Sequence, residues 1–430
     1  MNLWDKGTPV DALMQEFTVG NDRAMDARLA RWDVVGSIAH VGMLAAVGLL
    51  SKEEGEVLVQ ELSTILRDID EQGIVIDESA EDIHSHIEAM LTARLGDVGK
   101  KIHIARSRND QVLVDIKLFL RHELRTARRG VHELVGILLE QADAFRSVLL
   151  PGYTHFQVAM PSSFGLWFGG HAEALLEDLR VLDMAIDAAN ANPLGSAAGY
   201  GSSFSIDRDL TTRALNFDRM HITSTFAQAS RGRTERLAAI ALAQVASSMA
   251  RFASDVVLYM SQNFGFITLP DALTTGSSIM PHKKNPDVFE VLRARCNRLQ
   301  ALPVEIGLMT ANLPSGYHRD MQFIKDLIIP AIDEFALCVR IMQHVVPQIS
   351  PTLHIMDDAR YRYAYSVDHV HALVMQGHTF RGAYRMVADQ IANGTYEPRS
   401  VSLPQGNAPH IGSVEEPGLF LLRERWKQAL

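Results

Sequence analysis

The sequence has few of the residues that would stabilise a protein outside a reducing compartment. It has two cysteines in 430 residues, Cys296 and Cys338, which are far apart and in no spacing typical of metal ligands. A disulfide framework is therefore not expected, and the reducing cytoplasm is the expected compartment. The first twenty residues lack the basic start and apolar run of a secretion signal. No unbroken apolar stretch approaches the ~18–20 residues that span a bilayer. We therefore expect a cytoplasmic protein with no membrane partner.

An excess of positive charge is also absent. Lys and Arg number 41 against 51 Asp and Glu, which gives a formal net charge of -10. A non-specific binder of nucleic acid or of anionic membranes needs an electropositive face, so neither partner is expected. The basic clusters at 125–130 and 231–236 are short, and we interpret them as solvated helix faces or local anion sites. Apolar residues make up 47% and charged residues 21%, as in an ordinary globular protein.

Sustained alternation of apolar and polar residues, the pattern of a half-buried strand, is missing as well. Apolar or small residues instead recur every three or four positions from Leu113 to Phe145, which predicts a helix. Such a helix of roughly 33 residues would be about 50 Å long, as a rod in a long bundle is. The stretch 234–262 contains neither glycine nor proline and predicts a second long helix. Three further stretches predict helices: 161–190, 286–312 and 319–346. We expect Pro303 and Pro330 to kink or interrupt the last two.

Three zones follow from these patterns. They are residues 1–104 with shorter helices, 105–355 with the long helices, and 356–430 as a small helical tail. In the first zone, the helix predicted at 33–51 ends in a glycine-containing segment and a serine that caps the next helix. In the last zone, a loop-rich stretch at 402–418 precedes a final short helix. Short extended segments fit at 73–78 and 202–208.

The first of three polar interruptions lies at 105–112, at the entrance to the longest predicted helix. Ser107, Arg108 and Asn109 offer a hydroxyl, a forked guanidinium and an amide where a helix N-terminus presents free N–H groups. This arrangement suits a carboxylate or a phosphate. Helix capping with a surface ion pair explains the same residues equally well.

The second interruption, at 152–157, brings the adjacent Thr154 and His155 behind a Pro-Gly break. A lone histidine is more often structural than catalytic. Elsewhere, His84 and His86 have an i, i+2 spacing that places them apart on a helix, and no third ligand lies at a telling distance. We therefore expect no metal site.

The third interruption is the stretch 274–287, TTGSSIMPHKKNPD. Its prolines and its glycine exclude a continuous helix. Lys283 and Lys284 beside Asn285 form a locally positive surface that stabilises developing negative charge. A mobile surface loop is the alternative interpretation. Together, the three interruptions indicate a site that binds a small molecule with several negative charges and manages protons.

The same stretch resembles the signature loop of the fumarase/aspartase superfamily. The pattern Gly-Ser-x-x-Met-x-x-Lys-x-Asn is matched at Gly276, Ser277, Met280, Lys283 and Asn285. The segments SRNDQV (107–112), GYTHFQ (152–157) and LPSGYHRDMQ (313–322) narrow the resemblance to the argininosuccinate lyase family, which includes the delta-crystallins. The similarity covers nearly the whole chain.

The resemblance implies an all-α fold with three mostly helical domains and a central bundle of five long helices. Four identical subunits would form a twenty-helix core, and each active site would draw loops from three of them. It implies neither a metal nor another cofactor. It also explains how polar segments scattered along the chain meet, because they need not meet within one chain.

The implied reaction is the reversible cleavage of argininosuccinate to L-arginine and fumarate in arginine biosynthesis, through an aci-carboxylate intermediate. In this reading Ser277 is the base, Lys283 and Asn285 hold the carboxylate, and His155 paired with Glu290 helps to protonate the leaving nitrogen. The final proton donor stays open between His155, Thr154 and a bound water. Two groups of residues would bind the substrate: Ser107, Arg108 and Asn109 at the succinyl carboxylates, and Tyr317, Gln322 and Lys325 at the amino-acid end.

Some positions depart from the family pattern. Arg319 stands where lysine is common, and Asp22 stands where a substrate-binding serine is expected, within a divergent segment at 18–26. The segment 83–91 diverges too. Two alternatives therefore stay open: a sister lyase for another succinylated amine, which residues around Tyr317 would distinguish, and an inactive structural assembly such as some delta-crystallins.

Overall fold

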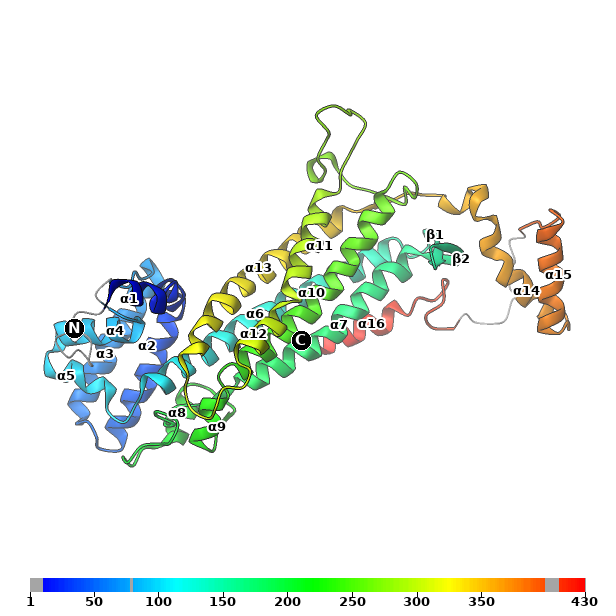
Figure 1. Ribbon diagram of the computed structural model, residues 1–430. Helices are drawn as coiled ribbons and strands as arrows, with labels where there is room; N and C mark the ends of the chain where they lie inside the picture. The colour runs from blue at the N-terminus through cyan, green and yellow to red at the C-terminus, as the bar shows by residue number, and fades with distance from the viewer. Residues whose placement is uncertain (1–10, 78–79, 399–409, 430) are drawn as a thin grey trace. The chain divides into compact units, whose positions relative to one another are not determined.

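Helices dominate the computed structural model, which describes residues 11–77, 80–398 and 410–429 (Figure 1). Within these residues, the strands form three sheets of two short strands each. The prediction of an all-α fold is therefore confirmed. Residues 402–409 of the predicted loop-rich stretch lie outside the described residues, and residues 410–418 contain no helix or strand, as predicted.

The chain divides into two compact units. Unit 1 comprises the described parts of Met1–Arg128, Arg180–Gln244 and Arg298–Ala336, and unit 2 those of Arg129–Leu179, Val245–Asn297 and Leu337–Leu430. These units are defined by contacts in space, so each combines segments that are distant in sequence. The three sequence domains, 1–104, 105–355 and 356–430, stay a prediction.

Four long helices contribute residues to both units. They are α6 (Arg108–Ala144), α7 (Phe164–Ala189), α10 (Arg233–Met260) and α13 (Ile324–Val345). Their spacing of three and four residues buries one face: Leu113, Leu120, Leu134 and Leu138 of α6 are 0% exposed. The helices predicted at 113–145, 161–190 and 234–262 are therefore confirmed, with ends shifted by a few residues.

Unit 1 also contains the helices of the N-terminal part, where shorter helices were predicted. They are α1 (Ala12–Val19), α2 (Asp22–Ala46), α3 (Lys52–Gln72), α4 (Ile83–Leu95) and α5 (Asp97–Lys100). Helices α2 and α3, with 25 and 21 residues, are instead about as long as α13 with 22. Between α7 and α10 follow β3 (Ala191–Asn192), α8 (Arg208–Ala214), β4 (Arg219–Met220) and α9 (Ser224–Ala229), with β3 and β4 parallel. The predicted serine cap is Ser51, whose hydroxyl accepts from the backbone of Glu54 while Glu54 accepts from that of Ser51.

Unit 2 contains a β-hairpin that sequence periodicity did not predict. Strands β1 (Leu149–Thr154) and β2 (Gln157–Ser163) pair antiparallel between α6 and α7. The other elements of unit 2 are β5 (Ile267–Thr268), α11 (Asp287–Leu299), β6 (Ser350–Pro351), α14 (Ser366–Met375), α15 (Phe380–Ala392) and α16 (Leu419–Gln428). Strands β5 and β6 pair antiparallel, and α16 is the predicted final short helix.

Gly136 weakens α6 as a helix, but its lack of a side chain allows another helix to pack closely against it. A Cβ on Gly136 would lie 2.8 Å from the ring of Trp426 in α16. The Trp426 indole in turn donates to the carbonyl of His132 at 2.9 Å. Gly136 is therefore explained by the close packing of α16 on α6.

The two predicted proline effects have different outcomes. The predicted helix 286–312 is interrupted, because α11 ends at Leu299 and Pro303 lies in the first turn of α12 (Leu302–Met309). Pro330 lies inside α13 and does not end the helix, and Pro330 is exposed to solvent.

One stretch within the described residues, Ser224–Met260, is long and apolar enough to cross a membrane by length and composition. It contains α9 and α10, and 61% of its most apolar window is buried inside the protein. Burial of this kind is typical of the central helix of a helical bundle.

Candidate active site

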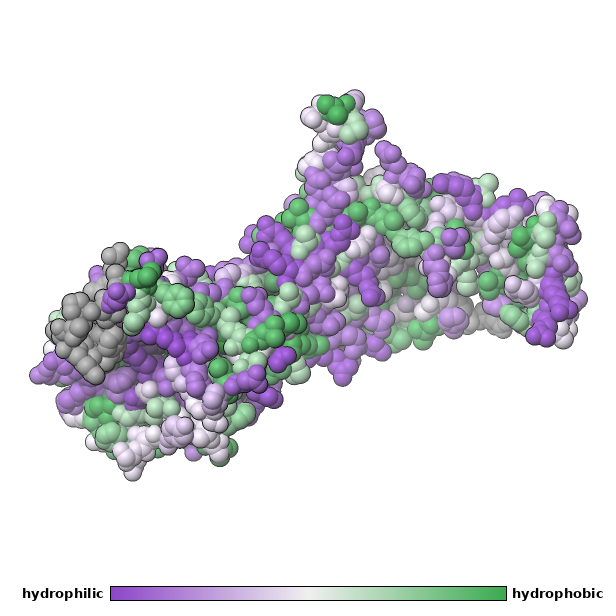
Figure 2. Space-filling model, in the orientation of Figure 1, coloured by the Kyte–Doolittle hydropathy of each residue, from purple (hydrophilic) through white to green (hydrophobic). Residues whose placement is uncertain are grey.

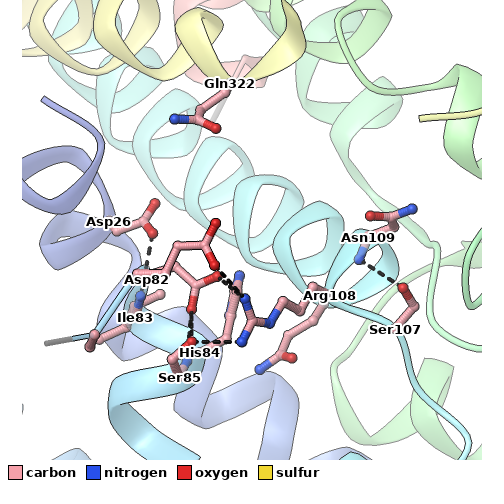
Figure 3. Close-up of polar contacts among 12 residues, drawn as sticks. Asp26, Asp82, Ile83, His84, Ser85, Ser107, Arg108, Asn109 and Gln322 are labelled. Atoms are coloured by element: carbon pink, nitrogen blue, oxygen red, sulfur yellow. Dashed lines mark hydrogen bonds and ion pairs between the residues drawn. The ribbon is translucent and has the colours of Figure 1, made fainter. Parts of the chain in front are cut away.

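Arg108 is fixed at the first residue of α6 by three side chains of a neighbouring segment in unit 1. Its guanidinium lies 3.1 Å from a carboxylate oxygen of Asp82, 3.3 Å from one of Glu81, and donates to the hydroxyl of Ser85 at 2.7 Å. Figure 3 shows this group with the dashed contacts that link Asp82, Ser85 and Arg108. The guanidinium is thus held before any ligand arrives, which reduces the entropy lost on binding.

Ser107 and Asn109 flank Arg108 and shape the start of α6. The Ser107 hydroxyl accepts from the backbone N–H of Asn109 at 3.2 Å, as an N-terminal cap does. The backbone N–H of Ser107 donates to the buried Asp110 at 2.9 Å. Asp110 also accepts hydrogen bonds from the backbone N–H groups of Gly195 and Ala197. It therefore links the loop between β3 and α8 to the start of α6. The capping expected from the sequence is present, and the amide of Asn109 stays partly exposed beside it.

A cavity of about 190 Å³ lies beside this helix start. Acidic and basic residues line it in nearly equal number: Asp22, Asp26, Glu81, Asp82, His84, Arg108, Arg231, Arg319 and Lys325. Asn109, Tyr317 and Gln322 line it as well. The cavity therefore gathers both groups of predicted substrate-binding residues except Ser107. Every one of these lining residues belongs to unit 1.

Lys325 of α13 lines the cavity and forms ion pairs with two carboxylates. Its ammonium contacts Asp22 at 2.5 Å and also contacts Asp26, both from α2. Burial alone would lower the pKa of Lys325, but Asp26 and Asp22 raise it. Burial raises the pKa of Asp22 to about 6, against the lowering effect of Lys325 and with a further rise from Asp26. Asp22, the departure from the family's serine, is thus the partner of Lys325.

The remaining predicted residues of this end also have partners. The Gln322 amide donates to the carbonyl of Thr18 at 2.9 Å. The ring centre of Tyr317 lies 5.5 Å from the guanidinium carbon of Arg231, which is a cation–π distance.

A buried charged cluster adjoins the cavity through His84, which is one of the lining residues. The Nδ1 of His84 lies 2.9 Å from Asp33 and 3.7 Å from Asp115, and Gln111 donates to the same oxygen of Asp33 at 2.6 Å. Burial would lower the pKa of His84, but Asp33, Asp82 and Asp115 raise it to about 9. The imidazolium therefore lies between the carboxylate of Asp33 and the side chain of Asp115, whose pKa burial raises well above its ordinary value.

This cluster could not be predicted from the sequence. Asp33, His84 and Asp115 bring three ligand-type atoms within 4.8 Å of one another, but they come from α2, α4 and α6. The expectation of no metal was drawn from the local spacing of His84 and His86, which carries no information on residues of other helices. Asp82 caps α4, and its side chain accepts from the Ser85 N–H at 2.8 Å. This capping sequence predicts where α4 begins, but it does not predict that Asp82 pairs with Arg108.

We expect the cluster to make thermal stability fall with rising pH. A histidine whose folded pKa is raised stabilises the fold below its unfolded pKa, near 6.5, and that stabilisation disappears as the pH rises through about 9. The effect is on the order of 3 kcal/mol, or several degrees in Tm. Circular dichroism melting at pH 6.5 and pH 9.5 should therefore show a larger drop in Tm for the wild-type protein than for His84→Gln. The exposed His378→Gln should behave like wild type, and an equal drop in all three proteins would contradict the assignment.

Thr154 and His155 lie at the tip of the hairpin in unit 2. Thr154 pairs with Gln157, and His155 and Phe156 between them have φ values of 53° and 55°. Two-residue hairpin turns with positive φ at both positions are normally made by Asn-Gly or Asp-Gly. Two bulky residues in this conformation cost roughly 1–2 kcal/mol each, and strain of this kind concentrates at functional sites. Both side chains are exposed at the tip.

The loop between α10 and α11 carries Ser277, Lys283 and Asn285 and projects from the helices (Figure 1). Thr275 and Asn285 close its base through backbone hydrogen bonds of 3.3 and 2.8 Å. The Ser277 hydroxyl accepts from the backbone N–H groups of Ile279 at 3.3 Å and Met280 at 3.2 Å. The loop tip is hydrophobic (Figure 2), with Ile279 83% exposed.

Within one chain, the structure does not bring all of the unit 2 residues together. Glu290 is exposed in the first turn of α11, and Lys283 is exposed on the loop. Among the described residues, no hydrogen bond or ion pair links His155 to Glu290 or either of them to Ser277. The pairing of His155 with Glu290 stays a prediction.

Comparison with known proteins places these features in a family. Residues 5–301 match the sequence profile of a family described as lyase. The chain is 51% identical to argininosuccinate lyase of Parabacteroides distasonis over 96% of this chain and 92% of that one. It is 38% identical to argininosuccinate lyase of Thermotoga neapolitana over 90% of this chain and 98% of that one.

Solved structures share the fold. An EDDS lyase in complex with formate superposes with a TM-score of 0.76 at 22% identity and covers 98% of this chain and 90% of its own. A fumarate lyase described as a delta crystallin, from Brucella melitensis, superposes with a TM-score of 0.69 at 17% identity over 95% of this chain and 92% of its own. On the sequence matches, the chain belongs to the argininosuccinate lyase family.

Proposed function

We propose that the protein is a carbon–nitrogen lyase that reversibly cleaves argininosuccinate to L-arginine and fumarate. The observation that carries the proposal is the 51% identity to an argininosuccinate lyase over 96% of the chain. The loop sequence Gly276-Ser277 through Lys283 and Asn285 is intact in this chain, as are Thr154 and His155. An inactive structural assembly would not need these residues.

The reaction requires more than proton transfer. A proton leaves the carbon beside a succinyl carboxylate, the electrons delocalise onto that carboxylate, and the guanidinium nitrogen then departs. A positioned acid or base contributes roughly 10²–10⁴-fold, whereas enzymes accelerate reactions by at least about 10⁶-fold. Stabilisation of the aci-carboxylate, about 3–4 kcal/mol for each well-placed donor, must supply much of the remainder.

Ser277 acts as the base in this proposal. A serine hydroxyl is a weak base in water, so its alkoxide needs donors that already point at it. The N–H groups of Ile279 and Met280 lie within hydrogen-bond distance of its oxygen. Lys283 and Asn285 on the same loop then face the carboxylate that gains charge, once the loop closes over the substrate.

Residues at the tip of the β1–β2 hairpin protonate the leaving nitrogen. His155 is exposed and held in a strained turn, so it is presented to a partner surface rather than packed into its own chain. Glu290 pairs with it in the assembled enzyme and orients the imidazole. The proton reaches the nitrogen from His155, from Thr154 or from a bound water.

The succinyl group binds at the start of α6. Its carboxylates accept from the guanidinium of Arg108, the hydroxyl of Ser107 and the amide of Asn109. The amino-acid end lies toward Tyr317, Gln322 and Lys325, which line the same cavity together with Arg108 and Asn109.

A homotetramer completes the site. Exposed apolar side chains lie along α11, α12 and α13 of a single chain, including Val291 at 52%, Val304 at 61% and Leu308 at 73%. A groove of about 380 Å³ on α11 and α13 is lined by Val288, Leu292, Leu337 and Ile341 among others. Apolar surface of this kind marks association sites. We propose that packing of these helices between subunits joins Arg108 of one chain to Ser277 of another, in a cytoplasmic enzyme without a metal or cofactor.

The proposal is tested by the ultraviolet absorbance of fumarate when the purified protein is mixed with argininosuccinate. We expect the absorbance to rise in proportion to enzyme. Silence with argininosuccinate together with turnover of adenylosuccinate would reassign the protein to a sister lyase, and silence with both would favour a structural role.

A further inference from the structure

Arg231 is a buried cation with unused hydrogen-bond donors. It lies just before α10, is 3% exposed and lines the cavity beside Tyr317 and Lys325. Its Nη2 donates to the carbonyl of Met321 at 3.4 Å, while its Nε and Nη1 have no acceptor among the described residues. Burying a charged group with idle donors is costly unless a ligand supplies the acceptor.

The other cations of the cavity are already paired. Lys325 contacts two carboxylates, Arg108 contacts Glu81 and Asp82, and Arg319 lies 3.5 Å from Glu81. Within the described residues, Arg231 forms no ion pair with a carboxylate at 4.0 Å or less, although burial raises the pKa of Glu235 and the charge of Arg231 lowers it. The nearest acid along the chain, Glu235, instead accepts from the backbone N–H of Gly232 at 2.8 Å. Of the described cations that line the cavity, Arg231 is therefore the one available to a new anion.

The groups beside Arg231 carry the opposite excess charge. Asp22 and Asp26 together hold one more charge than Lys325 neutralises, so the cluster has a spare negative charge when all three groups are ionised. With a pKa of about 6, set first by burial, Asp22 is ionised at neutral pH. A spare carboxylate beside a spare guanidinium complements the ammonium and carboxylate of an α-amino acid.

We propose that Arg231 binds the α-carboxylate at the amino-acid end of the substrate and thereby selects α-amino acids over the corresponding amines. The inference rests on the proposed lyase reaction and adds to it Arg231, from the basic cluster at 231–236, which is not among the predicted substrate-binding residues. Lys325, neutralised by two acids, then positions Asp22 rather than binding the carboxylate itself. The carboxylate is remote from the bond that breaks, so its contact contributes equally before and during the reaction and acts mainly on KM.

The reverse reaction provides the test, because L-arginine and agmatine differ only in the α-carboxylate. Consumption of fumarate is followed with each amine, using the full-length wild-type protein, Arg231→Met, Arg231→Lys and Arg233→Met. We expect wild type to favour arginine by about 100-fold in kcat/KM, and Arg231→Met to lose that preference through a higher KM for arginine alone. Arg231→Lys should recover part of it. Arg233, exposed in the same cluster, should be replaceable without effect.

The possible results test the role of Arg231 separately from the proposed lyase reaction. Unchanged preference in Arg231→Met, or an equal loss with both amines, would overturn the role of Arg231, the latter by indicating a structural one. A wild-type protein that consumes fumarate with neither amine would overturn the proposed function itself. Activity with arginine and loss of preference in Arg231→Met alone would support both.

Discussion

Ser277→Ala is expected to reduce kcat by about 10³–10⁴-fold while leaving the oligomer intact. The substitution removes the oxygen that accepts the α-proton, and the N–H groups of Ile279 and Met280 then have no alkoxide to stabilise. Stability should change little, because the hydroxyl makes only local contacts within the projecting loop. Fumarate absorbance gives kcat, and size-exclusion chromatography with circular dichroism monitors assembly.

Ser278→Ala is the matched control for this substitution. Ser278 is the adjacent serine, is exposed, and lies on the same loop. We expect it to keep nearly full activity. If Ser277→Ala keeps more than a few per cent of wild-type kcat, Ser277 is not the base.

Arg108→Met is expected to lower kcat/KM by about 10³-fold. The guanidinium is pre-oriented by Asp82, Glu81 and Ser85, so its loss removes a fixed cation at the succinyl end. It also leaves two acids facing an anionic substrate, which adds repulsion. Steady-state kinetics with argininosuccinate measure the effect.

Arg128→Met provides the comparison for Arg108→Met. Arg128 lies on the same helix, and its guanidinium forms an ion pair with Asp183 that includes a 3.2 Å hydrogen bond. An ion pair of this kind contributes ~0–1 kcal/mol, so activity should stay close to wild type. Similar kinetics for the two variants would rule out Arg108 as a substrate ligand.

The long helices could be predicted because their physics is local. A period near 3.6 residues from Leu113 to Phe145 requires only that one face be buried, and α6 buries that face. The hairpin at 149–163 could not be predicted in the same way. Its strands are short and only partly buried, so no alternation of apolar and polar residues marks them.

The candidate site was predictable by residue type but not by partnership. Arg108 stood out as a cation in a polar segment, and the family resemblance indicated Lys325. The acids that pair with Arg108 lie just before α4, and Asp26, which pairs with Lys325, is about 300 residues away in the sequence. Local spacing carries no information about such pairs. The turn at His155 and Phe156 defeats prediction for another reason, since positive φ at two non-glycine residues contradicts turn propensities. A backbone conformation that local sequence preferences disfavour is expected mainly at functional sites, and the tip of this hairpin fits that expectation.

Mixed oligomers test most directly whether Arg108 and Ser277 act in one site built from different subunits. Arg108→Met and Ser277→Ala, each nearly inactive alone, are co-expressed with different affinity tags, and oligomers that carry both tags are isolated. Random assembly leaves about a quarter of the sites with both wild-type residues, so about a quarter of wild-type activity should return. Doubly tagged tetramers that stay as inactive as their parents would contradict a shared site.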